Sequence, residues 1–435
     1  MPTAIEFFKL LPKTNCRECG QPTCLAFAML LANQKAKIDD CPHVSESSKS
    51  ALAESSAPPV RVVTVGAGKE VKMGGETVLY RHERRFINPI AYAVTVSDNC
   101  DVQDRIEYIK GLRYERVGMI FDVDMVSVRY DSGDPGKYAD TVKKVMELWD
   151  RPFILECSAD VLENALSISS KRRPLIYCAT SSNMDDMTRT AKKFSCPLAI
   201  KDNDLETLAG LAEKAKAAGV DDIVLDLGAS NLKECLEGHT IARRSAIKKK
   251  FKPFGYPLMN RVGSGEYAVA VAAMSTMKYG SLVIFDDLKN YEALPLFTLR
   301  QNIYTDPQVP IQVKQGIYPI GDPDEHSPIF FTTNFSLTYF TVRADIEKSK
   351  MPVWLQIVDT EGLSVLTAYS AGKFSAEKVA EVLKESGVLS RSNGVVVVPG
   401  LVARMSGKLQ ELIDRRIVVG TSESRDIPKF LKNLS

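Results

Sequence analysis

Four cysteines crowded near the start of the chain constrain its fold more than any other feature. Cys16, Cys19, Cys24 and Cys41 follow the spacing C-x2-C-x4-C-x16-C, whereas the other five cysteines are spread singly along the sequence. Thiols this close together are metal ligands or disulfide partners. The N-terminus shows no secretory signal, so we expect a reducing cytoplasmic location and therefore a metal site.

A short helix is predicted before the first cysteine. Thr3 and Glu6 have the spacing of a capping box, and the apolar residues that follow share one helical face. Pro12 is expected to end this helix, because proline cannot continue the hydrogen-bond pattern. The first cysteine therefore follows soon after a helix end.

The first three cysteines lie on a loop, and the fourth lies beyond a helix. Gly20 and Pro22 allow the backbone to turn tightly around a compact ligand. Thr23 is a suitable N-cap for a helix over residues 24–37, whose apolar side would cover the site. Cys41 returns from the far end, and a proline follows it directly. Loop thiolates with one distant Cys-Pro are typical of a 4Fe–4S site.

Zinc is the alternative metal for the same four thiols. A four-thiolate zinc site would use an identical set of ligands. Zinc ribbons usually present two separated C-x2-C pairs, and this motif contains one. The spacing therefore favours an iron–sulfur cluster over zinc.

Size and composition narrow the class of protein. A chain of 435 residues is long enough for about two to four domains. A formal net charge of +2 argues against an electrostatic nucleic-acid binder. The longest apolar run, residues 25–32, is too short to cross a bilayer, so we expect no membrane-spanning segment. These features suit a cytoplasmic carrier or enzyme.

A linker and a small β-hairpin are predicted after the cysteine module. Residues 45–59 are rich in serine and alanine and end in Pro-Pro, which is typical of a linker. Residues 61–65 and 77–82 are β-like runs joined through glycine turns. Residues 66–69 read Gly-Ala-Gly-Lys, but Glu70 stands where a phosphate loop needs serine or threonine. We interpret that segment as a turn.

Residues 91–312 alternate short apolar runs with amphipathic segments. Helices are predicted between the runs, for example over 137–148 and 205–218. About eight βα units over this length indicate a TIM barrel, with a doubly wound open sheet as the alternative. The predicted strands cover 93–96, 117–120, 127–129, 153–155, 175–177, 198–200, 223–226, 258–260 and 282–285.

Three polar residues fall at or near the carboxyl ends of these strands, where a barrel carries its chemistry. They are Glu156, Asp226 and Asn260. We find no paired carboxylates, metal-ligand spacing or nucleophile–base set around them. The barrel is therefore expected to be a scaffold or docking domain rather than a second active site, and no catalytic residue is assigned.

A small doubly wound α/β domain is predicted from about residue 318. Its strands would cover 329–332, 354–358, 395–398 and 417–419, and its helices 376–386 and 401–414. Loops 332–338, 359–373 and 399–407 follow three of the strands and combine glycines, hydroxyls and apolar residues. That composition suits a large, flat, mostly neutral cofactor. The alternative is a set of ordinary turns.

Several runs closely resemble the large (gamma) subunit of the corrinoid iron–sulfur protein of the reductive acetyl-CoA pathway. The resemblance covers essentially the whole chain. It rests on the cysteine motif and on residues 25–29 (Leu-Ala-Phe-Ala-Met), 304–310 (Tyr-Thr-Asp-Pro-Gln-Val-Pro), 332–339 (Thr-Thr-Asn-Phe-Ser-Leu-Thr-Tyr) and 362–369 (Gly-Leu-Ser-Val-Leu-Thr-Ala-Tyr).

The resemblance implies three domains and two cofactors. A 4Fe–4S domain with its linker would span residues 1–58, a TIM barrel with an N-terminal hairpin 59–317, and a corrinoid (cobamide) domain 318–435. The cluster ligands would be Cys16, Cys19, Cys24 and Cys41. The corrinoid contacts would be Thr332, Thr338, Gly362, Leu363, Ser364, Val365 and Ile427.

One segment resembles the beginning of a different B12 motif. Asp324-Glu-His326 matches the start of D-x-H-x-x-G, which supplies an axial histidine in many B12 proteins. Ile329 stands where the motif needs glycine, and the segment precedes a predicted strand instead of following one. We interpret the match as coincidence. The resemblance agrees, because this family holds its corrinoid base-off without a protein axial ligand.

The resemblance further implies a methyl carrier. Its Co(I) form would accept methyl from methyltetrahydrofolate through a methyltransferase and deliver it to acetyl-CoA synthase, while the cluster reactivates Co(II). Implied partners are a small TIM-barrel subunit in a heterodimer, the methyltetrahydrofolate:corrinoid methyltransferase, CO dehydrogenase/acetyl-CoA synthase and a reductive activator. Segments 57–59 and 321–323 would act as hinges. The alternatives are a ferredoxin-like electron carrier without corrinoid and a zinc-stabilised interaction module.

Overall fold

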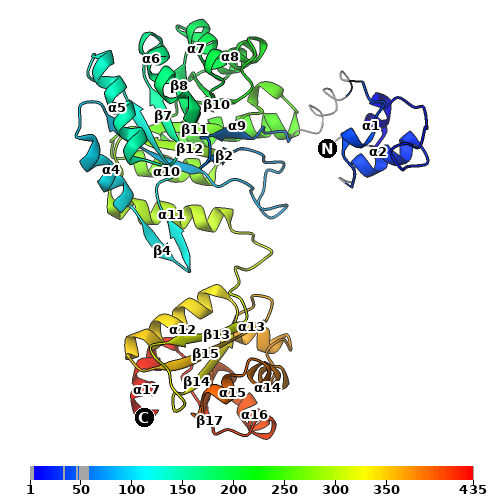
Figure 1. Ribbon diagram of the computed structural model, residues 1–435, viewed down its shortest axis with the longest axis vertical. Helices are drawn as coiled ribbons and strands as arrows, with labels where there is room; N and C mark the ends of the chain where they lie inside the picture. Colours follow the sequence, from blue (N-terminus) through cyan, green and yellow to red (C-terminus); the bar gives the residue numbers. More distant parts are fainter. Residues whose placement is uncertain (1–3, 33–34, 46–47, 49–57, 435) are drawn as a thin grey trace. The chain divides into compact units, whose positions relative to one another are not determined.

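The structure is a computed structural model that describes residues 4–32, 35–45, 48 and 58–434. The chain divides into two compact units, residues 1–112 with 122–304 and residues 113–121 with 305–435 (Figure 1). Thr3 of the predicted capping box, and Ala57 with most of the predicted linker, lie outside the described residues. No described helix has both the length and the apolar character needed to span a membrane.

Three short helical segments form the N-terminal module. They are α1 (Ala4–Leu10), α2 (Cys24–Ala32) and the 3₁₀ turn η1 (Ile38–Asp40). The helix expected before Pro12 is confirmed, but the prediction that the next helix reaches residue 37 is wrong. The amide of Lys35 donates to the carbonyl of Leu30, and such an i→i−5 bond closes a helix instead of extending it.

Eight parallel strands close into a barrel in the order β10-β11-β12-β3-β6-β7-β8-β9, as the TIM-barrel prediction required. Eight of the nine predicted strands belong to it. The strands are β3 (Ala91–Ser97), β6 (Met125–Arg129), β7 (Phe153–Glu156), β8 (Leu175–Ala179), β9 (Leu198–Lys201), β10 (Ile223–Asp226), β11 (Leu258–Val262) and β12 (Gly280–Phe285).

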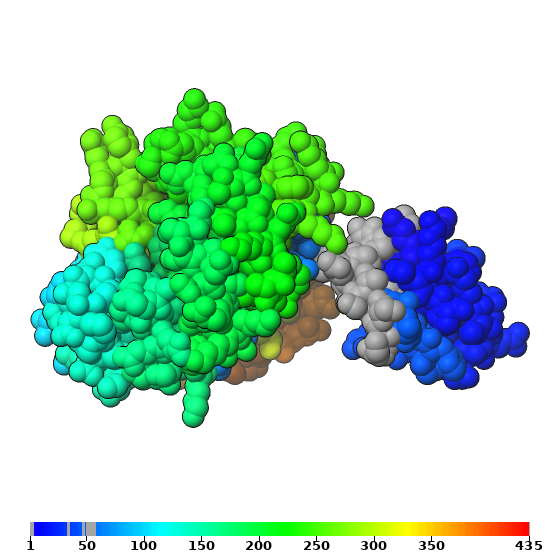
Figure 2. Space-filling view, turned by 90° about the horizontal axis from the view of Figure 1, so that it is seen from above, coloured from blue at the N-terminus to red at the C-terminus, as the bar shows by residue number. Residues whose placement is uncertain are grey.

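Helices surround the barrel, and in the space-filling view those coloured cyan to green form its outer surface (Figure 2). Their apolar sides pack inward, while charged residues lie on the outside. They are α4 (Val102–Gly111), α5 (Pro135–Leu148), α6 (Ala159–Ser169), α7 (Met184–Phe194), α8 (Leu205–Ala217), α9 (Leu232–Lys248), α10 (Ala268–Met277) and α11 (Asn290–Tyr304), with 3₁₀ turns η2 (Ser170–Arg172) and η3 (Lys252–Phe254).

An antiparallel hairpin closes the amino end of the barrel. Strands β1 (Val63–Val65) and β2 (Val71–Met73) pair directly, and their buried side chains join the barrel core. The amide of Gly66 donates to Arg173 just before β8, which places the hairpin at that end. The predicted strand over 77–82 is wrong, because Gly74 and Gly75 both have positive φ and turn the chain out of the ladder.

The predicted strand over 117–120 is also wrong as a barrel strand. It forms part of a second hairpin, β4 (Tyr114–Arg116) and β5 (Met119–Phe121), that belongs to the second unit. Val117 and Gly118 both have positive φ, as in the two-residue turns that suit hairpins. Any Cβ at Gly118 would collide with the ring of Phe340, so glycine is needed there for packing as well.

A five-stranded sheet with the order β13-β15-β14-β16-β17 forms the centre of the second unit. The edge strand β13 (Gly316–Ile320) is antiparallel, and it was missed because it is short and carries a proline. The parallel strands are β14 (Ile329–Thr333), β15 (Val353–Val358), β16 (Val396–Val398) and β17 (Ile417–Val419), close to the predicted ranges.

Both faces of this sheet are covered, which confirms the doubly wound architecture. Phe331 points into one core and Phe330 into the other. On the side of Phe330 lie α12 (Ser336–Ser349) and α17 (Ile427–Leu434). On the side of Phe331 lie α13 (Val365–Ser370), α14 (Ala376–Glu385), α15 (Val388–Arg391), the 3₁₀ turn η4 (Gly400–Met405) and α16 (Ser406–Leu412). A further 3₁₀ turn, η5 (Ser424–Asp426), precedes α17.

Two details of this unit correct the expectations. The helix predicted over 401–414 is split at Val402, whose φ and ψ of −121° and 31° are not helical. Segment 321–323 joins β13 to β14 inside one sheet, so it is not an inter-domain hinge. Apart from the hairpin segment 113–121, the second unit begins at Thr305, and the predicted domain limits at 58 and 317 stay predictions.

Candidate functional sites

The cysteine module buries two of its four thiols in a small apolar core. Cys24 and Cys41 lie in one buried cluster with Phe7, Phe27 and other apolar residues of α1 and α2. Cys19 packs against this cluster and is partly exposed, whereas Cys16 is exposed. Folding of the module therefore brings together cysteines that come from both sides of α2.

Side chains next to the cysteines hold the loop in place. Asn15 accepts a hydrogen bond from the amide of Cys24 at 2.8 Å. The hydroxyl of Thr23 accepts one from the amide of Ala26 at 3.1 Å, which confirms the expected N-cap. Gly20 has a φ of +76°, and its amide donates to the carbonyl of Arg17. The loop between Cys16 and Cys24 is thus a defined turn.

The spacing of the sulfur atoms is relevant to the choice of metal. A tetrahedral zinc with Zn–S bonds of about 2.3 Å would place its sulfurs about 3.8 Å apart. Among the described residues, no three cysteines bring their sulfurs within 4.8 Å of one another. All the cysteines are free thiols, so four thiol donors are present without the close approach that a single zinc ion requires.

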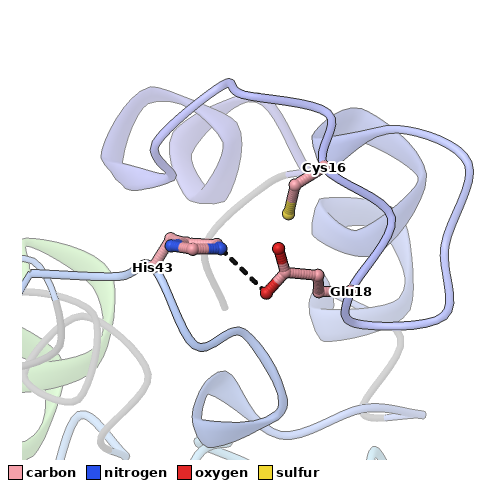
Figure 3. A group of neighbouring side chains, drawn as sticks. All are labelled: Cys16, Glu18 and His43. Atoms are coloured by element: carbon pink, nitrogen blue, oxygen red, sulfur yellow. Dashed lines mark hydrogen bonds and ion pairs between the residues drawn. The ribbon is translucent and has the colours of Figure 1, made fainter.

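A different group of ligand atoms does come together in this module. The ligand atoms of Cys16, Glu18 and His43 all lie within 4.8 Å of one another, and all three residues are exposed (Figure 3). His43 Nε2 lies 2.9 Å from Glu18 Oε2. The sequence analysis missed the last two residues, although each lies within two positions of a predicted ligand. An ion held by this group would compete with a cluster for Cys16.

A pocket of about 380 Å³ opens at the carboxyl edge of the sheet in the second unit. Segments that follow β14, β15, β16 and β17 contribute to its lining. In the strand order β14 lies beside β16, and the chain leaves β14 toward β15 on one side but leaves β16 toward β17 on the other, so the connections of these two neighbours run in opposite directions. Ligands of open α/β sheets bind at such a switch point, beyond the carboxyl ends of the strands.

Five of the seven predicted corrinoid contacts line this pocket: Thr332, Thr338, Ser364, Val365 and Ile427. They come from β14, α12, the start of α13 and the start of α17. Residues more than ninety positions apart in the sequence thus meet at one edge of one sheet. The structure brings together the polar and apolar groups that the loop compositions suggested.

The other two predicted contacts lie beside the pocket rather than in its lining. Gly362 is buried with a φ of +75°, and a Cβ there would lie 2.8 Å from Gln312 Cγ and 3.0 Å from Pro310 Cβ. Leu363 packs against the core under the sheet. In this structure the glycine is needed for close packing of its own loop. The role of Gly362 and Leu363 as corrinoid contacts stays a prediction.

The chemistry of the lining suits a large, mostly neutral ligand. The hydroxyl of Thr332 is buried and has no hydrogen-bond partner, and leaving such a group unpaired costs about 1–3 kcal/mol. Leu337, Leu366 and Leu401 are 52%, 50% and 45% exposed in the same lining. Within the described part of the pocket, Glu423 is the one charged residue. An unpaired hydroxyl and exposed leucines are both features that a bound ligand would satisfy.

The pocket contains neither histidine nor cysteine among its described lining residues. His326, which the axial-ligand motif highlighted, is 79% exposed on its side chain and precedes β14, at the opposite edge of the sheet. The sequence has no cysteine after Cys235. The second unit therefore offers its pocket no nitrogen or sulfur ligand of these two types.

The carboxyl end of the barrel has a different character. Arg261 binds Glu156 at 2.6 Å and Asp286 at 2.7 Å, and Arg129 binds the same oxygen of Asp286 at 2.6 Å. The sequence analysis identified Glu156 but missed its three partners. Their charges largely neutralise one another. That the barrel is a scaffold without a second active site stays a prediction.

Asp226 and Asn260 are also committed to internal contacts. Asp226 accepts hydrogen bonds from the Tyr177 hydroxyl at 2.6 Å and the Gly228 amide at 2.8 Å, and burial raises the pKa of its carboxyl group. Asn260 contacts His239 Nε2 at 3.3 Å. Burial lowers the pKa of His239 to about 4, so this imidazole is neutral at pH 7.

Comparison with known proteins supports a single assignment. A family model described as "CO dehydrogenase/acetyl-CoA synthase delta subunit" matches residues 62–431, and one described as "Putative Fe-S cluster" matches residues 11–43. Among solved structures, dihydropteroate synthase from Thermus thermophilus is 13% identical, with a TM-score of 0.39, and covers 56% of this chain and 100% of that one. That likeness is too low to add to the barrel topology described above.

Curated relatives match almost the entire chain. The "Corrinoid/iron-sulfur protein large subunit" of Moorella thermoacetica is 43% identical over 99% of this chain and 98% of that protein. The "Acetyl-CoA decarbonylase/synthase complex subunit gamma" of Methanopyrus kandleri is 35% identical over 99% and 97%. The chain therefore belongs to the family of corrinoid/iron–sulfur protein large subunits and acetyl-CoA decarbonylase/synthase gamma subunits.

Proposed function

We propose that the protein is the corrinoid-binding methyl carrier of an acetyl-CoA-forming pathway, reactivated by a 4Fe–4S cluster on the same chain. The observation that carries this proposal is the pocket at the switch point of the second unit. Five side chains predicted to contact a corrinoid line it, and one of them has a buried hydroxyl without a partner. The name of the relative from Moorella thermoacetica supports the same cofactors.

Four thiols of the N-terminal module would hold the cluster. Cys16, Cys19, Cys24 and Cys41 are free, and two of them sit in an apolar core that would shield sulfur from water. Thiolates in such surroundings are the usual ligands of a 4Fe–4S cluster. The motif contains one C-x2-C pair instead of the two that zinc ribbons usually present, which supports a cluster over a single zinc ion.

The pocket residues would hold the corrinoid in different ways. Thr332 and Thr338 would present hydroxyls to polar groups of the ligand, whereas Val365 and Ile427 would provide apolar contact. The exposed leucines of the lining would cover the flat face of the macrocycle. When bound, the corrinoid supplies a cobalt that carries the methyl group, and the cluster supplies the electrons that keep this cobalt reactive.

We infer a base-off corrinoid without a protein axial ligand, and the residue types available support this inference. No described residue of the lining is histidine or cysteine, and His326 lies at the other edge of the sheet. A metal without a strong axial donor is more easily reduced, and ligand identity is a main control of potential. This composition therefore supports a low-valent methyl-accepting state.

The partners are proposed from the function and from the names of the relatives. A protein called a large subunit, or one subunit of a complex, works with other chains. We infer a small TIM-barrel subunit, a methyltetrahydrofolate:corrinoid methyltransferase, CO dehydrogenase/acetyl-CoA synthase and a reductive activator. A carrier must meet donor and acceptor in turn, which requires the second unit to dock at more than one place.

Metal analysis of the protein purified anaerobically in its native assembly tests the proposal. We expect about one cobalt and about four iron atoms per chain, with corrinoid absorption bands above a broad iron–sulfur shoulder. Iron without cobalt, even after reconstitution with hydroxocobalamin, would leave a ferredoxin-like electron carrier. Zinc without iron or colour would leave a zinc-stabilised interaction module. Either result would overturn the proposal.

A further inference from the structure

Asn334 lies at the end of β14 but is absent from the lining of the pocket. It is 2% exposed, and it lies in the run 332–339 and the loop 332–338 that the sequence analysis singled out, without having been assigned a role there. We propose that Asn334 is a positioning residue, which fixes the loop over residues 359–364 against the corrinoid pocket. This inference rests on the proposed function and deepens it.

The carbonyl oxygen of the Asn334 side chain gathers three donors from this loop. Its Oδ1 accepts from the amide of Thr360 at 3.0 Å, from the amide of Gly362 at 2.9 Å and from the hydroxyl of Thr360 at 3.1 Å. Two backbone N–H groups of a buried turn thus depend on one side chain.

The amide nitrogen of the same side chain is equally occupied. Its Nδ2 donates to Asp359 Oδ1 at 2.8 Å and to Gln312 Oε1 at 3.2 Å. A carboxamide has two N–H groups, so its donor capacity is used completely. The oxygen of the Asn334 side chain faces hydrogen-bond donors and its nitrogen faces acceptors. This arrangement fixes the orientation of the side-chain amide.

These bonds set the position of residues that do line the pocket. The single proton of the Thr360 hydroxyl is shared between Asn334 Oδ1 and the carbonyl of Leu363, which is also 3.1 Å away and lies directly before the pocket residues Ser364 and Val365. Gly362 is pressed against Gln312, which Asn334 holds from the other side. Displacement of the loop would therefore move two pocket residues relative to Thr332 on β14. Loss of Asn334 should loosen the ligand without removing any group that touches it.

The test measures how fast hydroxocobalamin dissociates from the full-length protein in its native assembly. The loaded protein is diluted into an excess of a second, cobalamin-free binding protein that captures the released ligand, and the transfer is followed by absorbance. Asn334→Ala leaves two buried amides without their acceptor, and an unmet buried donor costs about 1–3 kcal/mol. We expect dissociation to be at least about tenfold faster. Asn393→Ala is the matched control, because Asn393 makes its contacts at the opposite edge of the sheet.

A residue swap separates positioning from general destabilisation. Asn334→Asp keeps the acceptor but sets a carboxylate against Asp359, so release should be faster. Adding Asp359→Asn restores one donor and one acceptor with the bond reversed. The same Asp359 oxygen also accepts from the solvent-exposed amide of Glu361, which turns to water in the swapped pair. We expect the swapped pair to release cobalamin within about threefold of the wild type, at temperatures well below the Tm of each variant.

The outcomes distinguish this inference from the proposed function. If the wild type binds no hydroxocobalamin, the proposed function fails. If the wild type binds and Asn334→Ala releases at the same rate, Asn334 is not a positioning residue. If Asn334→Ala does not fold, the swap decides: release as fast as from Asn334→Asp alone would overturn the inference, and rescue would support it.

Discussion

The barrel and the doubly wound sheet of this protein differ at the carboxyl ends of their parallel strands. At the barrel, Arg261 and Arg129 fill the carboxyl edge with ion pairs to Glu156 and Asp286. At the doubly wound sheet, the same edge contains a pocket whose described lining has hydroxyls, exposed leucines and a single charged residue, Glu423. One edge satisfies its own polar groups, whereas the other leaves the Thr332 hydroxyl without a partner. The comparison shows that the usual ligand-binding edge of a fold can bind a ligand only if its polar and apolar side chains are not already paired with one another.

Removing the central arginine of the barrel mouth should have the largest effect. Arg261→Ala leaves Glu156 and Asp286 facing each other without their shared cation, and breaking a mostly buried ion pair costs about 3 kcal/mol. We expect a lower free energy of unfolding in urea, but unchanged cobalt content in the protein that remains folded.

Lys143→Ala is the control for that experiment. Its partner Asp140 is exposed, so loss of the pair should cost less than about 1 kcal/mol. Loss of cobalt from Arg261→Ala while the fold is intact would break the comparison, because it would mean that the barrel mouth takes part in corrinoid binding.

Crowding the loop beside the pocket should lower corrinoid loading by about tenfold. In Gly362→Val the new side chain would meet Gln312 and Pro310 at a backbone position with positive φ, so the loop must shift. Cobalt per folded chain measures the effect. Gly372→Val is a matched control, since Gly372 has a similar φ of +71° but open space around it. If both variants lost cobalt to the same extent, backbone strain and not the packing of this loop would determine how much corrinoid is bound.

The two units should also differ in their response to pH. The folded pKa of His239 lies near 4 because the ring is buried, below the ordinary value of 6.5. The unfolded chain therefore binds this proton first, so His239 contributes stability above pH 6.5 that is lost as pH falls toward 4, by about 1.4 kcal/mol per pH unit.

Urea unfolding at pH 7 and pH 5 measures this loss. We expect His239→Gln to flatten the pH dependence, whereas His326→Gln should not, because His326 is exposed. Corrinoid release from the wild type should change little over the same range, since the described lining of the pocket has no histidine. A pH-dependent release with a midpoint near 6.5 would contradict that contrast.

Local patterns predicted much of this architecture, because buried strands read as short apolar runs and turns as glycines. The hairpin at 113–121 was missed because Val117 to Ile120 looks like a strand, and its turn is set by positive φ at two residues. The contacts that define each edge were out of reach for another reason. Arg261 and Glu156 are 105 positions apart in the sequence, and Asn334 and Gly362 are 28 apart. These pairs therefore form only once the barrel and the second sheet have folded.

The smallest expected effect on stability comes from a substitution that tests the pocket of the doubly wound sheet most directly. Thr332→Val removes a buried hydroxyl that has no partner, so the folded protein should be unchanged or more stable by up to about 1 kcal/mol. If the hydroxyl serves the ligand, hydroxocobalamin affinity should nevertheless fall by about five- to tenfold. Thr333→Val is the matched control, because the neighbouring hydroxyl is also buried and unpaired but does not line the pocket. If both variants are more stable and only Thr332→Val binds hydroxocobalamin more weakly, the Thr332 hydroxyl serves ligand binding. If both variants bind hydroxocobalamin equally well, the unpaired Thr332 hydroxyl is only a packing defect of β14.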